Sequence, residues 1–444
     1  MYRIFLTFFT VLFLVSCGNL QQNSLDVFVN KNNPSEVELS PSVSVRTLSA
    51  DTKTWNDVVT NSAEILAAEI AILDAKREVE IVETAKGLQL NSSVQAGSMS
   101  IEDEKNGVLG TLNADQLISD FGYTDAKILQ AEANVELAKF NYLNTVDKQL
   151  LTAALALNAW ESGYDLMNLT YSKQVLAAPL IDNLRRLANA GQIDAIQLAS
   201  AERSIAQLEL TMVQTRGVIN QAETAIKKFF NSTPEKLNID LQDLANFTEQ
   251  LEKFRTSEAL PYRIAEQRKT LADLSLSMHK ISNAGTFVAR TKIDLPAADN
   301  IDPDASIGLV FSKNLKDAGR YNKIAEQLET KVLQAEANLV ATKLDLQTRS
   351  SDLKTKKASL KSVRDLRIKL IGNVEDQISQ LEDQLAIGSA SFNELLSAHV
   401  ELYQLEREEL EVSSELRQVN LELLALHDAL RRVFKVKLTI ALES

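Results

Sequence analysis

Hydrophobic and polar positions alternate with two different periods along the chain, and the change of period divides it into elements. From Trp55 to Lys86 apolar residues recur at spacings of three and four, which is typical of an amphipathic helix. After Gly87, apolar and polar residues alternate one by one, which is typical of strands. The pattern predicts a β-hairpin over residues 88–119, with a polar turn at 102–106.

The helical period returns after this hairpin and continues much longer than in an ordinary globular protein. It predicts a long helix over 124–187, a reversal at Gly191 and a return helix over 194–230. The long helix has 64 residues (187 − 124 + 1) and would extend about 96 Å at about 1.5 Å per residue. Pro179 lies inside it, and we expect a kink there because proline removes a backbone hydrogen bond.

The second half repeats this order of elements. A further helix precedes a predicted hairpin over 286–315, a long helix over 320–386, a reversal at Gly388 and a return helix over 391–434. Along the return helix, apolar residues keep an alternating spacing of three and four, which predicts a coiled-coil seam. The residues of this seam are Leu395, Ala398, Leu402, Leu405, Val412, Leu416, Val419, Leu423, Leu426, Leu430 and Val433.

Short stretches of sequence also recur between the halves, which indicates an internal duplication. At offsets of 204, 197 and 204 (333 − 129, 388 − 191 and 429 − 225), the matching stretches are Leu129–Asn134 with Leu333–Asn338, Gly191 with Gly388, and Ala225–Phe230 with Ala429–Phe434. The two offsets differ by seven residues, which preserves the apolar face of a helix. We therefore expect a first repeat over 54–255 and a second over 256–444.

The N-terminus predicts export from the cytoplasm. Arg3 precedes a nearly unbroken apolar run over 4–15, which is shorter than the roughly 20 residues that a membrane-spanning helix needs. This pattern predicts a secretory signal peptide over 1–16. Its last residues and Cys17 (Leu-Val-Ser-Cys) resemble a bacterial lipobox, so we expect a lipid such as palmitate on Cys17 and a lipidated tether over 17–53. An ordinary signal peptide with an incidental cysteine is the alternative.

Composition narrows the range of functions. Cys17 is the only cysteine, which excludes an intrachain disulfide framework and a thiolate zinc site. With 14 Gly and 7 Pro in 444 residues the chain has few helix breakers, and the net charge of −13 argues against a nucleic-acid partner. The histidines His279, His399 and His427 are scattered, and no phosphate-binding or nucleophile motif is present. We therefore expect no enzyme activity and no metal or other cofactor.

The four predicted strands pose a problem of closure. Each has about ten residues, the length of a transmembrane β-strand. Four strands cannot close a barrel, and open edges in a bilayer would leave unpaired backbone groups that cost several kcal/mol each. Several copies would have to join, and three copies would supply twelve strands. Soluble hairpins remain the alternative, because alternation alone does not distinguish them.

The order of elements, the duplication and the lipobox together resemble the TolC-type outer-membrane factor family. The resemblance covers about residues 54–434, and its degenerate motifs lie at 186–191, 309–320 and 388–398. It implies a mainly α fold with a small transmembrane β part, in which a homotrimer forms a 12-stranded β-barrel that an α-helical barrel continues. It also implies a bacterial outer-membrane location, with a lipid anchor and an extension into the periplasm.

The resemblance further implies a function and its sites. The chain would be the passive exit duct of a tripartite efflux or type I secretion system, bound to a periplasmic adaptor (membrane fusion) protein and an inner-membrane transporter. Glu394 matches an acidic position at the family's pore entrance, and a solvated carboxylate on a helix face is the alternative for it. The adaptor-docking tips correspond to Ala190, Gly191, Gln192 and Ile193 and to Ile387, Gly388, Ser389 and Ala390.

The sequence departs from the family at its gate. The second acidic entrance position is Ser397, and the tyrosine and arginine that latch the family's best-known gates are replaced by Leu385 and Ala390. Two other classes of protein remain as alternatives, a periplasmic adaptor lipoprotein and a structural coiled-coil lipoprotein. An adaptor has one helical hairpin, whereas this chain has two.

Overall fold

The computed structural model describes residues 52–97, 107–233, 241, 244–249, 251, 254–296, 303–314 and 317–438. The predicted signal peptide, the lipobox with Cys17 and the tether up to residue 51 lie outside the described residues. All elements described below belong to one compact unit, Ser44–Val436.

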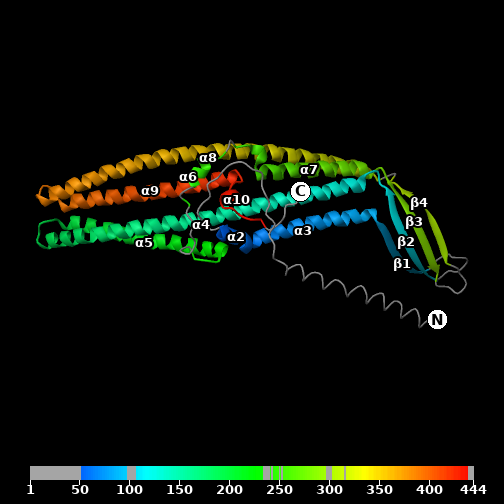
Figure 1. Ribbon diagram of the computed structural model, residues 1–444, viewed down its shortest axis with the longest axis horizontal. Coiled ribbons are helices and arrows are strands. Elements are labelled where there is room, and N and C mark those ends of the chain that lie inside the picture. The colour runs from blue at the N-terminus through cyan, green and yellow to red at the C-terminus, as the bar shows by residue number, and fades with distance from the viewer. Residues whose placement is uncertain are drawn as a thin grey trace, which may run out of the picture. The chain divides into compact units, whose positions relative to one another are not determined.

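The expected order of elements is present in both halves (Figure 1). The first half contains α2 (Thr52–Asn61), α3 (Ala63–Glu83), η2 (Thr84–Lys86), β1 (Leu88–Gly97), β2 (Gly107–Ser119), α4 (Tyr123–Asn189) and α5 (Ala195–Phe230). α6 (Leu244–Glu249) completes the first half, and the second half contains η4 (Thr256–Glu258), α7 (Leu260–Ser282), β3 (Thr286–Pro296), β4 (Asp304–Ser312), α8 (Arg320–Ala386), α9 (Phe392–Leu426) and α10 (Leu430–Val433). Pro179 lies inside α4, which continues past it to Asn189.

The two hairpins join in a single antiparallel sheet with the order β1-β2-β3-β4. The pairing of β2 with β3 connects strands from different halves of the chain; for example, Leu112 lies opposite Ile293. The periodicity predicted each hairpin but not this pairing. Because β1 and β4 are the outer strands, both edges of the sheet are open within the described chain.

The long helices α4 and α8 have 67 residues each, about 100 Å at about 1.5 Å per residue. Near the sheet α3 and α7 pack beside them, and beyond the midpoint α5 and α9 do so (Figure 1). α4 also packs against α7 and α9, so it joins the two halves. The predicted seam of α9 is confirmed where Leu395, Ala398 and Leu402 pack against Val374 and Ile378 of α8.

The first predicted helix is interrupted, which corrects the single helix expected from Trp55 to Lys86. Ser62 has an extended backbone between α2 and α3, and its hydroxyl accepts a hydrogen bond from the Ile65 amide at 3.3 Å. Serine at this position supplies an acceptor for an otherwise unpaired amide of the first helical turn. The apolar period continues across the interruption, which is why the pattern did not reveal it.

The return helix expected over 391–434 is also interrupted. α9 ends at Leu426, Asp428 has a left-handed backbone (φ 51°), and the short α10 follows. The Asp428 carboxylate accepts a hydrogen bond from the Leu260 amide at 3.0 Å, which connects this break to the first turn of α7. A contact 168 residues away in the sequence thus stabilises the break.

Structurally equivalent positions in the two long helices are 197 residues apart in the sequence. Gly122 and Gly319 (319 − 122 = 197) both have left-handed backbones and immediately precede α4 and α8. The match between Leu129–Asn134 and Leu333–Asn338, at 204, therefore pairs positions seven residues apart in the two helices. Seven residues make nearly two turns, so a heptad pattern repeats on the same face without structural equivalence.

The other match at 204 has a structural counterpart in a cluster of aromatic rings. Phe434 stacks on Trp55 with ring centroids 3.7 Å apart, and Phe230 contacts the same ring edge-on at 5.4 Å. The ends of both halves therefore pack against one residue of α2. Phe230 and Phe434 are 204 residues apart (434 − 230), seven more than equivalent positions in the long helices. The break near Asp428 and the short α10 supply these seven extra residues in the second half.

Candidate functional site

One face of the sheet is apolar and exposed. The registers of the three strand pairs place a row of apolar residues from each of the four strands on this face. Its exposed large side chains are Leu88, Leu90, Val94, Val108, Leu112, Phe287, Leu295, Ile307, Leu309 and Phe311, of which Ile307 is the most exposed at 84%. A continuous apolar face of this kind marks a surface that contacts another protein or a membrane.

The opposite face of the sheet is mainly polar and carries one ion pair between β2 and β3 and one within β3. Arg290 on β3 donates two hydrogen bonds to the Asp115 carboxylate on β2, at 2.7 and 2.9 Å. Asp294 accepts hydrogen bonds from Lys292 at 2.6 Å and from the Thr111 hydroxyl at 2.7 Å. The charges that the alternation placed away from the apolar residues therefore neutralise one another on a single polar surface.

The two turns at the far ends of the long helices have the same backbone geometry. Gly191 and Gly388 have left-handed conformations with φ of 69° and 77°. A Cβ at either glycine would meet no atom within 4 Å, so the backbone conformation and not crowding favours glycine. The predicted docking residues lie at these two turns, where Ile387 is 81% exposed.

The first carboxylate after each turn helps to cap the helix that follows. Glu394 accepts hydrogen bonds from the amide and hydroxyl of Ser391, at 2.7 and 2.9 Å, and these bonds hold the pKa of Glu394 below its usual range. Asp194 is itself the N-cap residue of α5 and accepts a hydrogen bond from the Ile196 amide at 3.2 Å. Glu394 is thus a capping residue of α9, and its expected role at a pore entrance stays a prediction.

Polar contacts connect the first helical hairpin to α9, and sequence reasoning missed them. Arg417 donates to Asn158 Oδ1 at 2.7 Å and to Ser162 Oγ at 3.0 Å. Nearer the turns, the hydroxyls of Thr170 and Tyr403 lie 3.2 Å apart. The only available signal was a polar residue at a core position of a helix, which does not reveal its partner.

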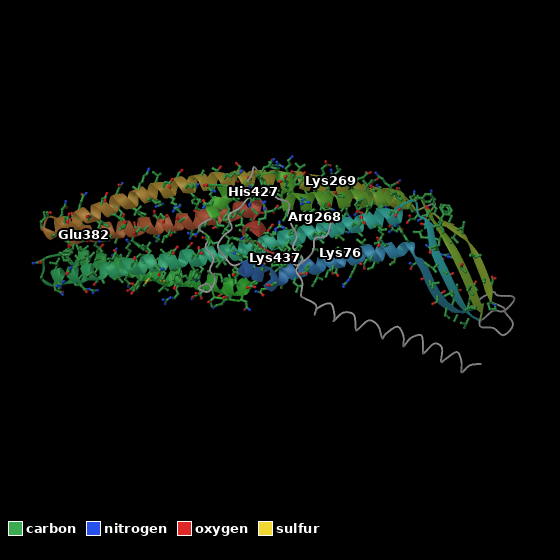
Figure 2. The ribbon with its side chains drawn as sticks, viewed as in Figure 1. Lys76, Arg268, Lys269, Glu382, His427 and Lys437 are labelled. Atoms are coloured by element: carbon green, nitrogen blue, oxygen red, sulfur yellow. The ribbon has the colours of Figure 1, made fainter. Side chains whose placement is uncertain are left out.

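A row of ion pairs also connects α8 to α9. The pairs are Arg349–Glu422 at 3.9 Å, Lys356–Glu415 at 2.6 Å, Arg364–Glu409 at 3.1 Å and Arg367–Glu408. Such half-exposed pairs contribute about 0–1 kcal/mol each, so they favour one register of the two helices more than they add stability. Figure 2 shows the charged side chains along these helices, with Glu382 near the turn that ends α8.

A buried ion pair lies where α10 meets α4. Arg431 Nε lies 2.9 Å from Asp147 Oδ1, and Asp147 is 5% exposed. Burial raises the pKa of Asp147 to about 7 in spite of Arg431, and burial raises the pKa of the neighbouring Asp428 to about 6. The second carboxylate oxygen of Asp147 is buried and has no hydrogen-bond partner among the described residues. The charged form of Asp147 is therefore costly in this fold.

The described residues bear on two of the sequence predictions, the membrane segments and the metal site. No helix among them is long and apolar enough to cross a membrane. Within the same residues, no group of three or more histidine, cysteine, aspartate or glutamate side chains could hold a metal ion.

Comparison with known proteins gives a consistent result for the fold. The chain is similar to the outer membrane protein VceC of Vibrio cholerae, with a TM-score of 0.72 and 14% identity over 84% of this chain and 95% of that one. It is similar to the Campylobacter jejuni CmeC outer membrane channel, with a TM-score of 0.71 and 12% identity over 89% and 94%. It is also similar to the Neisseria gonorrhoeae MtrE outer membrane channel, with a TM-score of 0.62 and 15% identity over 90% of this chain and 95% of that one.

No protein-family model matches the sequence, and the search of curated proteins gives no significant match. The structural matches span nearly the whole length of the proteins compared, so they concern the entire architecture and not one hairpin. The chain therefore has the fold of these outer-membrane channels, with two long helical hairpins and a four-stranded sheet.

Proposed function

We propose that this protein is the exit duct of a tripartite efflux or type I secretion system in a bacterial outer membrane. The observation that carries the proposal is the sheet: four strands with one exposed apolar face, one polar face and two open edges. An apolar face of this extent in contact with water would be a liability, and open edges in a bilayer would be costly. Both problems disappear if copies of the chain join edge to edge within a membrane.

The proposed assembly is a homotrimer. Three copies supply twelve strands, and β4 of one copy pairs with β1 of the next, so no edge remains. The apolar face then contacts lipid, and the polar face with Arg290 and Asp115 lines the inside. The helical hairpins of the three copies pack side by side and continue the tube away from the membrane. Cys17, outside the described residues, would carry the lipid anchor.

The proposed mechanism is passive conduction without catalysis. Solutes would pass along the polar inner surface, and the energy would come from an inner-membrane transporter. The two turns, Ala190–Ile193 and Ile387–Ala390, would dock a periplasmic adaptor, because they are the exposed ends of the helical hairpins. Glu394 of each copy would lie near the entrance, and its capping bonds to Ser391 would hold the carboxylate in place.

Replacing Gly388 with valine tests docking at this turn separately from pore formation. A β-branched residue is strained at φ 77° by about 1–2 kcal/mol, so the turn should change its backbone while the rest of the chain folds. We expect the Gly388→Val protein to form pores in planar lipid bilayers as the natural protein does. In a deletion strain it should restore export at least about tenfold less well, since about 1.4 kcal/mol corresponds to tenfold in an equilibrium.

Gly372→Val is the matched control, because Gly372 lies inside α8 and its backbone φ is not positive. This control should keep both pore formation and export. Full export by Gly388→Val would count against docking at this turn. Absence of pores from the natural protein would count against the duct itself.

A further inference from the structure

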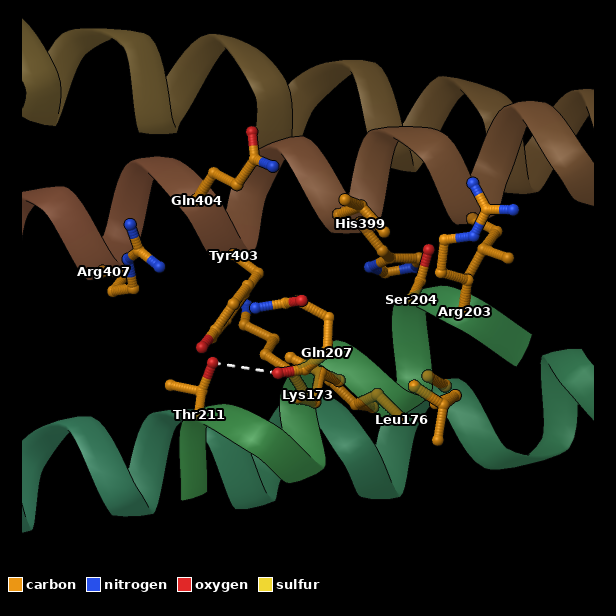
Figure 3. A pocket seen from close by; sticks show the side chains of 15 residues that line it. Lys173, Leu176, Arg203, Ser204, Gln207, Thr211, His399, Tyr403, Gln404 and Arg407 are labelled. Atoms are coloured by element: carbon orange, nitrogen blue, oxygen red, sulfur yellow. Dashed lines mark hydrogen bonds between the residues drawn. The ribbon is translucent and has the colours of Figure 1, made fainter. Parts of the chain in front are cut away.

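A cavity of about 280 Å³ lies between α4, α5 and α9 (Figure 3). Along α9 it lies nearer the turn at Gly388 than Arg417 does. Its walls come from both helical hairpins: Lys173 and Leu176 on α4, Leu208 on α5, and His399 and Tyr403 on α9. The volume is close to the lower end for sites of small organic molecules, which are about 300–1,000 Å³. A molecule in this cavity would contact the first hairpin and α9 together.

The lining of the cavity is cationic and apolar. It includes Lys173, Arg203 and Arg407 and no aspartate or glutamate. Lys173 lies 2.6 Å from Glu406, so its charge already has a partner. Arg203 has no carboxylate within ion-pair distance in the part of the chain that the structure describes. Arg203 and Arg407 come from opposite hairpins, and Figure 3 draws both around the cavity.

Two buried nitrogen atoms in this lining lack a hydrogen-bond partner among the described residues. They are Nδ1 of His399 and Nε of Arg407. The Arg407 Nε lies 3.4 Å from Glu411, an ion pair without hydrogen-bond geometry. Burial lowers the pKa of His399, so its neutral ring can donate only one N–H. Arg407 Nε is always a donor, and a buried donor without an acceptor costs about 1–3 kcal/mol, which favours an acceptor arriving from outside.

We propose that this cavity binds a small anionic amphiphile with one acyl or aryl chain, such as a medium-chain carboxylate. The carboxylate would accept a hydrogen bond from the buried Nε of Arg407, and the chain would lie on the apolar part of the wall at Leu176 and Leu208. A cavity of this volume has room for one chain and not for a two-chain lipid. The inference does not depend on the proposed duct, because it concerns binding to the folded chain.

Binding would also affect the contact between the hairpins. The ligand would contact α4, α5 and α9 at once and bind only the folded arrangement. A ligand that binds the folded state alone stabilises it by mass action. The midpoint of thermal unfolding should therefore rise with octanoate concentration.

The test is isothermal titration of octanoate into the full-length protein in a neutral detergent, with a blank titration into micelles alone. We expect one saturable site per chain and about tenfold weaker binding of octan-1-ol, because hydrogen bonds to charged groups contribute about 1.5–3 kcal/mol. Dihexanoyl phosphatidylglycerol should not displace octanoate. Displacement would overturn the assignment to a single-chain ligand.

Variants locate the site. Arg407→Gln should weaken octanoate binding about five- to tenfold, in line with the loss of one charged hydrogen-bond partner, and Arg203→Gln at the other end of the cavity should weaken it less. Leu176→Trp should fill the cavity and abolish binding. Arg216→Gln is the matched control, because Arg216 is exposed on α5 outside the cavity. Equal binding by the natural protein and Arg407→Gln, or equal binding of octanoate and octan-1-ol, would overturn the proposal.

Discussion

Replacing Ile307 with arginine should destabilise the assembled protein by about 2–4 kcal/mol per chain, the cost of arginine on the lipid face of a transmembrane strand near the bilayer midplane. Ile307 is 84% exposed in the single chain, so the new side chain meets no clash there. The cost arises only if lipid covers this face. The measurement is the urea midpoint of the assembly reconstituted in vesicles, together with the amount of protein in the outer-membrane fraction.

Ser306→Arg is the matched control, because Ser306 is the neighbouring residue of β4 and lies on the polar face. It is also exposed, so arginine there should cost no more than about 0.5 kcal/mol. The two substitutions add the same charge one residue apart and differ only in the face of the sheet. Equal, small effects of both would indicate that water and not lipid contacts the apolar face.

Replacing Arg431 with methionine should destabilise the folded chain by about 3–5 kcal/mol at pH 8. Methionine is similar in length but leaves the Asp147 carboxylate buried without its partner at 2.9 Å, and breaking a buried pair in this way has about that cost. The measurement is chemical unfolding followed by circular dichroism. Arg432→Met, which changes an exposed neighbour, should cost less than about 1 kcal/mol.

The loss of stability in Arg431→Met should depend on pH, and the pKa of Asp147 determines the direction of this dependence. Its pKa is about 7 in the fold and 3.8 ordinarily, so the folded state binds this proton more tightly. Proton binding by Asp147 therefore adds fully to the free energy of unfolding below about pH 4, and this addition is lost as the pH rises through about 7. Arg431→Met should consequently be less harmful at pH 5 than at pH 8. Adding Asp147→Asn should remove most of this difference, although Asp428 still titrates near pH 6.

Local periodicity accounts for what could be predicted from the sequence. The strands alternate because one face is apolar, and the long helices repeat every three or four residues because one side packs against a neighbour. Gly191 and Gly388 were recognisable because a left-handed turn after a helix strongly favours glycine. Each of these signals lies within a few residues of the element it predicts.

Contacts between distant residues account for most of what was missed. Asp147 and Arg431 are 284 residues apart, and Thr111 and Asp294 are 183 apart, so no local pattern pairs them. The heptad match at Leu129 and Leu333 misled because any helix with this repeat resembles itself after seven residues. The capping role of Glu394 was open to prediction, since Ser391 stands three positions before it, as in a capping box.

The number of chains in the purified assembly tests the central proposal most directly. Native mass spectrometry of the detergent-extracted protein, with the mass of the lipidated chain measured separately under denaturing conditions, gives this number without reference to any cargo. We expect a mass of three chains, because three four-stranded sheets would close into one wall of twelve strands without free edges. A stable single chain, with its apolar sheet face and both outer strands exposed, would contradict the account.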